Sequence, residues 1–139
     1  MLKKLEREGY IKKLPKIEQQ VQESLKLAER DLETARNMLN QNYDWTFNIA
    51  YNSILQSTRA LMYSKGYRAS SRNSHIATMK FAKIYLDESD ILYFDRMRRK
   101  RHQAVYDTAG TISLNEAKNA ILRAEEITKK VKKIIYLKQ

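Results

Sequence analysis

Apolar side chains recur every three or four residues along most of the chain, and this spacing predicts a helical protein. The first such run indicates a long amphipathic helix over about residues 17–40, which the polar stretch "NQNYD" ends. In the next run, "WTFNIAYNSILQSTRALMYSK", apolar residues cover much more than one stripe, so we expect this helix to be the most buried one. Asp44 is placed to cap its start and Gly66 to cap its end.

The second half of the chain predicts three more helices. After the polar loop "YRASSRNS", Ser74 or a neighbour begins a third helix. The sequence "DESD" separates it from a fourth helix over about residues 89–108, which Gly110 stops. Ser113 and Glu116 stand in the S-x-x-E spacing of a capping box, and a last amphipathic helix follows them.

These elements predict one all-α domain. Short connections favour antiparallel neighbours, which gives an up-and-down bundle of about five helices over residues 16–139. We expect residues 1–15 to form a short, loosely attached N-terminal arm. The composition agrees with this fold class, because the 139 residues include only three glycines and one proline, Pro15, which precedes the first long helix.

The chain is strongly basic. Its 27 lysines and arginines against 16 acidic residues give a formal net charge of +11, which predicts attraction to polyanions. Nucleic acid is the first candidate partner, and an acidic protein is the second. No stretch approaches the roughly 20 apolar residues of a membrane span, and no signal peptide is evident, so we expect a cytoplasmic protein without a membrane partner.

Several classes of chemistry find no support in the sequence. The absence of cysteine excludes disulfides, thiolate metal sites and a cysteine nucleophile. His75 stands at a predicted helix start with no second histidine nearby, so we expect no metal site. The chain contains no P-loop, G-x-G-x-x-G or G-x-S-x-G motif, and we expect no cofactor.

The segment "FDRMRRKRHQAVYD" carries the densest charge of the chain. Its basic residues form the candidate set for binding phosphate or nucleic acid: Arg96, Arg98, Arg99, Lys100 and Arg101. At about 100° per residue, Arg98, Arg101 and His102 project into the apolar sector of this helix. That sector also holds Phe94 and Val105, so part of the charge lies where core residues are expected.

Two interpretations of this charge remain open. In the first, Arg98 and Arg101 lay their aliphatic stems over the core and reach water at its edge. In the second, they bind an anion. We expect no carboxylate of the same helix on that face, so the anion would come from another helix or from a ligand phosphate. The nearby His102 and Tyr106, which can transfer a proton or hydrogen-bond a phosphate, favour the second interpretation.

Four features together resemble the HEPN family, the higher-eukaryote-and-prokaryote nucleotide-binding domains. They are the pattern A-x2-D-L-x2-A in the first helix, "AYN" in the second, the Gly66 loop, and an Arg-rich helix ending in "RHQAVYD" before a capped last helix. The resemblance covers about residues 19–135.

This resemblance implies an all-α bundle that forms a homodimer, in which the Arg motifs of two protomers meet across a cleft. Many HEPN proteins are metal-independent endoribonucleases with an R-x4-6-H motif, and many are toxins neutralised by a small nucleotidyltransferase. The implied ligand is RNA or a nucleotide, and the implied partner is a nucleotidyltransferase antitoxin. Tyr51 and Arg59 of the second helix are implied to support the motif helix, although core packing and a surface ion pair are simpler roles for them.

The family's register makes Arg101 the motif arginine and His102 its polar follower, and it leaves Tyr106 where the catalytic histidine would stand. A second register, Arg96 with His102, fits the spacing but sets the two side chains far apart around the helix. Arginine can bind phosphate through its fork, whereas a tyrosine side chain, with an ordinary pKa near 10, is a poor base. The candidate catalytic residues are therefore Arg101, His102 and Tyr106.

Two functions follow from this departure from the motif. In the first, the protein is a non-catalytic HEPN module that binds nucleotide or RNA through a basic dimer cleft, as one component of a toxin–antitoxin pair. In the second, it is an active metal-independent endoribonuclease toxin, in which His102 supplies the missing group. The absent motif histidine favours the first function.

Overall fold

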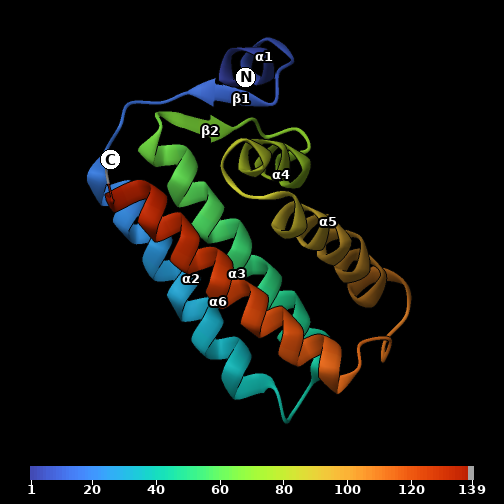
Figure 1. Cartoon of the computed structure of the whole chain (residues 1–139). Coiled ribbons are helices and arrows are strands. Elements are labelled where there is room, and N and C mark those ends of the chain that lie inside the picture. Colours follow the sequence, from blue (N-terminus) through green and yellow to red (C-terminus); the bar gives the residue numbers. More distant parts are fainter. Residues whose placement is uncertain (138–139) are drawn as a thin grey trace.

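The computed structural model describes residues 1–137, and it is an all-α bundle with a two-stranded ribbon at one end (Figure 1). Its α-helices are α1 (Leu2–Arg7), α2 (Glu18–Met38), α3 (Tyr43–Ser64), α4 (Ser74–Tyr85), α5 (Glu88–His102) and α6 (Leu114–Tyr136). A π-helical turn, η1 (Gln103–Asp107), continues α5, and the strands are β1 (Ile11–Lys13) and β2 (Tyr67–Ala69). The predicted fold class is confirmed.

Helix α3 lies at the centre of the bundle. Helices α2 and α6 pack against one side of it, and α4 and α5 pack against the other (Figure 1). Ala28 and Ser53 are fully buried where α2 meets α3, and the Ser53 hydroxyl donates a hydrogen bond of 2.7 Å to the Ala28 carbonyl. Because both side chains are small, the two backbones approach closely there. The prediction that this helix is the most buried is confirmed by the burial of residues all around it.

The predicted helix ends are correct in part. The Ser113–Glu116 capping box is present, with reciprocal hydrogen bonds of 3.1 and 3.0 Å. Gly66 follows the end of α3 with φ +85°, a left-handed conformation that favours glycine. The expectation for Asp44 is wrong, because the side chain of Asn42 caps α3, at 2.9 Å from the Trp45 amide.

Helix α5 has nearly the predicted extent but a different ending. Asp87 caps it, and the α-helical pattern stops at His102. In η1 the backbone turn widens, and the Thr108 amide donates to the Gln103 carbonyl at 2.9 Å. The expectation that Val105 lies on the buried stripe is wrong, since Val105 is 39% exposed and the buried residues of α5 are Asp90, Phe94 and Met97.

The N-terminal arm packs firmly onto the bundle. Strand β1 pairs antiparallel with β2, so that Ile11 lies opposite Ala69, and Ile11 is 1% exposed. The Ser70 hydroxyl also donates to the Gly9 carbonyl at 2.7 Å, and Leu5 of α1 joins the core. The expectation of a loosely attached arm is therefore wrong, because strand pairing and apolar burial both hold it.

Within residues 1–137, no helix combines the length and the apolar character needed to cross a membrane.

Candidate functional site

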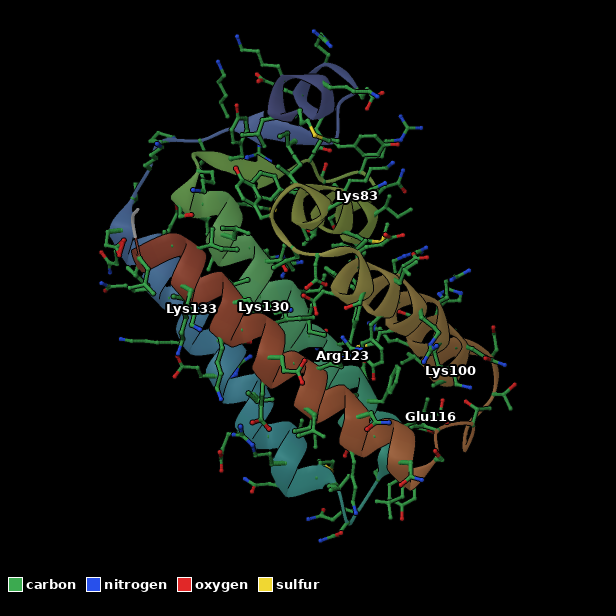
Figure 2. All side chains as sticks on the ribbon, viewed as in Figure 1. Lys83, Lys100, Glu116, Arg123, Lys130 and Lys133 are labelled. Carbon is green, nitrogen blue, oxygen red and sulfur yellow. The ribbon has the colours of Figure 1, made fainter. Side chains whose placement is uncertain are left out.

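The five basic residues of α5 point toward two different places. Arg98, Arg99 and Arg101 face the start of α4, where they line a cleft. Arg96 and Lys100 line a smaller pocket beside α6 instead. Lys100 lies 3.6 Å from a carboxylate oxygen of Glu116, and Figure 2 shows these two residues on the same side of the molecule. The structure thus brings together three of the five candidates and separates the other two from them.

The cleft between α4 and α5 has a volume of about 490 Å³. Two short segments line it, one around the start of α4 and one at the end of α5: Asn73, Ser74, His75, Ile76, Arg98, Arg99, Arg101 and His102. None of these lining residues is acidic. The chain has only two histidines, and the cleft contains both of them.

A carboxylate of α5 partly neutralises the arginines that line the cleft. Asp95 lies 2.9 Å from a guanidinium nitrogen of Arg98 and 3.3 Å from one of Arg99. These are the i,i+3 and i,i+4 spacings at which helical side chains meet. The expectation that no carboxylate of this helix reaches the basic face is therefore wrong. One carboxylate nevertheless serves two guanidinium groups, so positive charge remains in excess.

Neutral groups alone hold Arg101. Its Nε donates to the side-chain oxygen of Asn48 at 2.6 Å, and its guanidinium carbon lies 5.7 Å from the centre of the Tyr51 ring. Asn48 is 7% exposed and Tyr51 is fully buried, so both partners are fixed by α3. Within residues 1–137, Arg101 forms no ion pair. Its orientation is thus set without neutralising its charge.

Tyr51 also contacts the opposite wall of the cleft. Its hydroxyl lies 3.1 Å from Nδ1 of His75, and the two ring centres are 5.6 Å apart. Burial raises the pKa of Tyr51 above its ordinary value, so the hydroxyl stays protonated. Burial, followed by the positive charges of Arg101, Arg59 and Arg98, lowers the pKa of His75 below 6.5. His75 is therefore neutral at neutral pH.

Arg59 contributes charge to the site from a distance. Its guanidinium donates to the side-chain oxygen of Gln56 at 3.4 Å, and it does not line the cleft. Of the two residues predicted to support the site from the second helix, Tyr51 touches both walls and Arg59 acts through its electric field.

His102 and Tyr106 lie next to each other but face different surroundings. Their ring centres are 4.9 Å apart. His102 lines the cleft, whereas Tyr106, in the π-helical turn, is 65% exposed and is not among the lining residues. The widened turn of η1 places Tyr106 at this outer position.

Sequence reasoning missed His75 and Asn48 as parts of this site. From the sequence, His75 is considered only as a metal ligand, and that role is rejected. Asn48 and Tyr51 are three residues apart, so they share one face of α3, and that spacing is a usable signal. Nothing local in the sequence links either residue to α5 or α4, because those contacts join segments far apart along the chain.

Comparison with known proteins agrees with this architecture. A protein of known structure, TT1696 from Thermus thermophilus, has the same fold, with a TM-score of 0.67 and 15% sequence identity over 81% of this chain and 96% of its own. No curated protein sequence matches the chain. The HEPN domain profile matches residues 21–134, which span α2 to α6 and include both walls of the cleft. This match covers most of the sequence, and the chain therefore belongs to the HEPN domain family.

Proposed function

We propose that this HEPN protein binds RNA or nucleotides through their phosphate groups, in the cleft between α4 and α5. The observation that carries the proposal is the position of Arg101, which is oriented by Asn48 and Tyr51 and has no carboxylate partner in residues 1–137. A guanidinium group fixed in this way presents its remaining N–H groups to a phosphate in fork geometry. Little side-chain freedom is then lost on binding.

The surrounding charge supports the same ligand class. Arg98 and Arg99 share one carboxylate, and the net charge of +11 adds a long-range attraction for polyanions. The opposite wall adds neutral polar groups, the hydroxyl of Ser74 and the side-chain amide of Asn73. A strand of RNA presents several phosphates, so it can occupy more of this surface than a mononucleotide can.

The proposal includes a homodimer and a partner protein. Leu92 of α5 and Val105 and Tyr106 of η1 are exposed, and they flank the basic run of residues 96–101 in the sequence. Pairing two protomers through this surface would cover these apolar side chains and join two clefts. We also propose, from membership of the HEPN family alone, that the protein is one component of a toxin–antitoxin pair with a nucleotidyltransferase as the antitoxin.

A second candidate function is metal-independent cleavage of RNA. Its support is that both histidines and three arginines line one cleft. Such cleavage needs a group that takes a proton, a group that gives one, and a cation beside the phosphorus.

The test of phosphate binding is fluorescence anisotropy with a short labelled single-stranded RNA. Each phosphate neutralised on a single strand contributes about −0.7 to the slope of log affinity against log salt concentration, so we expect a steep loss of binding as salt rises. Absence of binding at low salt would contradict the proposal and would point to a protein partner. Light scattering of the same sample at micromolar concentration tests the dimer, and a monomer mass would contradict the shared cleft.

A further inference from the structure

We propose that His75, on α4 and outside the arginine motif, is the group that takes the 2′-hydroxyl proton when RNA held in the cleft is cleaved, and that Tyr51 orients its ring. This inference rests on the proposed binding of RNA phosphate in the same cleft. It assigns the catalytic base to a different helix from the one that carries the motif.

The first support is the position of His75. The start of α4 forms one wall of the cleft, and the end of α5 forms the other. His75 therefore faces the space into which Arg98, Arg101 and His102 also project. An RNA phosphate bound by Arg101 would bring its neighbouring ribose within this space.

The second support is the fixed orientation of the imidazole ring. Nδ1 is engaged by the Tyr51 hydroxyl at 3.1 Å, which leaves Nε2 free of that bond. Tyr51 is itself held rigidly, because it is fully buried and packs edge-on against Phe94 with ring centres 5.8 Å apart. When Nδ1 carries the proton and donates it to the Tyr51 oxygen, Nε2 presents its lone pair as a base.

The third support is the charge around His75. The groups that act on it are Arg59 from α3 and Arg98 and Arg101 from α5, all of them cationic, together with the neutral Tyr51. Burial and these charges lower its pKa, so the neutral, proton-accepting form is present at neutral pH. An imidazolium formed there has no carboxylate among the residues that line the cleft to stabilise it, which favours rapid loss of the proton afterwards.

The reaction is balanced without a metal, water or any other reactant. The 2′-oxygen attacks the adjacent phosphorus while its proton passes to Nε2 of His75. The bond from phosphorus to the 5′-oxygen breaks, and this oxygen takes a proton from the His102 side chain. The products are a 2′,3′-cyclic phosphate and a 5′-hydroxyl. Arg101 faces the negative charge that develops on the phosphorane.

The experiment measures RNA cleavage and RNA binding separately, on the whole chain with a chelator present. We expect the parent to cleave and His75→Ala to lose about 10²- to 10⁴-fold in rate while binding RNA as the parent does. His75→Gln keeps the size of the side chain and should lose as much, which excludes a packing effect. Free imidazole should restore part of the rate of His75→Ala.

Two further readouts separate a catalytic role from a structural one. The rate of the parent should rise with pH through the lowered pKa of His75, and this rising limb should vanish in His75→Gln. Tyr51→Phe removes only a hydroxyl, so it should lower kcat and leave KM unchanged. Melting followed by circular dichroism checks that each variant is folded.

The possible results distinguish this inference from the function on which it rests. A parent that binds RNA but leaves it intact would overturn the role of His75 and leave phosphate binding in place. Cleavage at the parent rate by His75→Gln would do the same. A parent that binds no RNA at low salt would overturn phosphate binding itself.

Discussion

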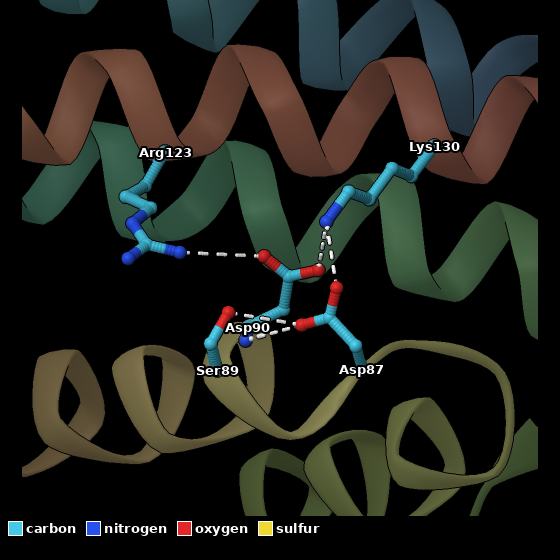
Figure 3. A network of polar contacts seen from close by, with 5 residues as sticks. All are labelled: Asp87, Ser89, Asp90, Arg123 and Lys130. Carbon is cyan, nitrogen blue, oxygen red and sulfur yellow. Dashed lines mark hydrogen bonds and ion pairs between the residues drawn. The ribbon is translucent and has the colours of Figure 1, made fainter.

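The two ends of α5 differ in how far their charged side chains are neutralised by ion pairs. At its start, the carboxylate of Asp90 is fully buried and lies between Lys130 and Arg123 of α6, and Asp87 caps the helix and also contacts Lys130 (Figure 3). At its end, three arginines face the cleft, and two of them, Arg98 and Arg99, share the carboxylate of Asp95.

The charges at the start of α5 therefore stabilise the fold, whereas those at its end remain available to a ligand. The acidic start is matched by cations on another helix, so it ties α5 to α6. A helix C-terminus favours cations by only about 0.3–1 kcal/mol each, which leaves most of the positive potential at the other end uncompensated. This end of α5 is where we propose that an external anion binds.

The largest expected effect is on stability, at the start of α5. Asp90→Asn should lower the free energy of unfolding by about 3 kcal/mol, toward the low end for a broken buried ion pair, because Lys130 and Arg123 remain partly in water. The matched change at the other end, Asp95→Asn, should cost about 1 kcal/mol or less, as for a solvent-accessible pair. Urea unfolding of both variants measures these free energies. Equal losses would contradict the expected difference between the two ends of α5.

The next largest effect is on RNA affinity, at the end of α5. Arg101→Ala should weaken binding by about 10- to 100-fold, since charge-assisted hydrogen bonds contribute roughly 1.5–3 kcal/mol. Arg36→Ala on α2 removes the same charge from a residue that is paired with Glu33 and Glu125, so it serves as the control. Anisotropy titrations at one salt concentration compare the RNA affinities of the two variants. A similar loss of affinity in both would show that net charge, and not the position of Arg101, determines binding.

A smaller effect of the opposite sign is expected from Asp95→Asn. Removing the carboxylate that Arg98 and Arg99 share should tighten RNA binding about two- to fivefold, which corresponds to the energy of a surface ion pair. The gain should shrink as salt rises. Weaker binding by this variant would mean that Asp95 positions the arginines rather than competing with the ligand for them.

The smallest effect concerns acid stability at the start of α5. Hydrogen bonds from the Asp90 amide and from Lys130 hold the pKa of Asp87 well below its ordinary value of 3.8. Stability from a carboxylate with a lowered pKa is present above that ordinary value and is lost as pH falls below it. Asp87→Asn keeps a capping side chain but cannot titrate, so its melting temperature should fall less steeply than that of the parent below about pH 4. Parallel curves for the two proteins would show that Asp87 does not contribute to acid unfolding.

Local sequence patterns predict most of the fold. The apolar periodicity indicates the long helices to within a few residues, and the Ser113–Glu116 spacing predicts a cap that is present. These features depend on side chains within one or two turns of each other. The π-helical turn after α5 was not predicted, because the spacing of its apolar residues is that of a continuing α-helix although none of its residues is fully buried.

The candidate site was predictable mainly on its motif helix. The basic run and the resemblance to the HEPN family pointed to Arg98, Arg99, Arg101 and His102, which do line one cleft. Tyr51 was also expected to support the site from the second helix, whereas the opposite wall and the second buried support, Asn48, were not predicted. His75 and Asn48 acquire their roles by contacting residues 24 and 53 positions away in the sequence.

The sequence by itself determined the helices, the all-α fold class and the presence of a dense positive charge on one of the helices. Only the tertiary structure decided which of those charges are neutralised, which face the cleft, and which neutral groups hold Arg101 and His75 in place. The physical reason is that helix formation depends on neighbours along the chain, whereas the environment of a charge depends on every element packed around it. In this protein those elements are α3, α4 and α6, which the bundle brings against the two ends of α5.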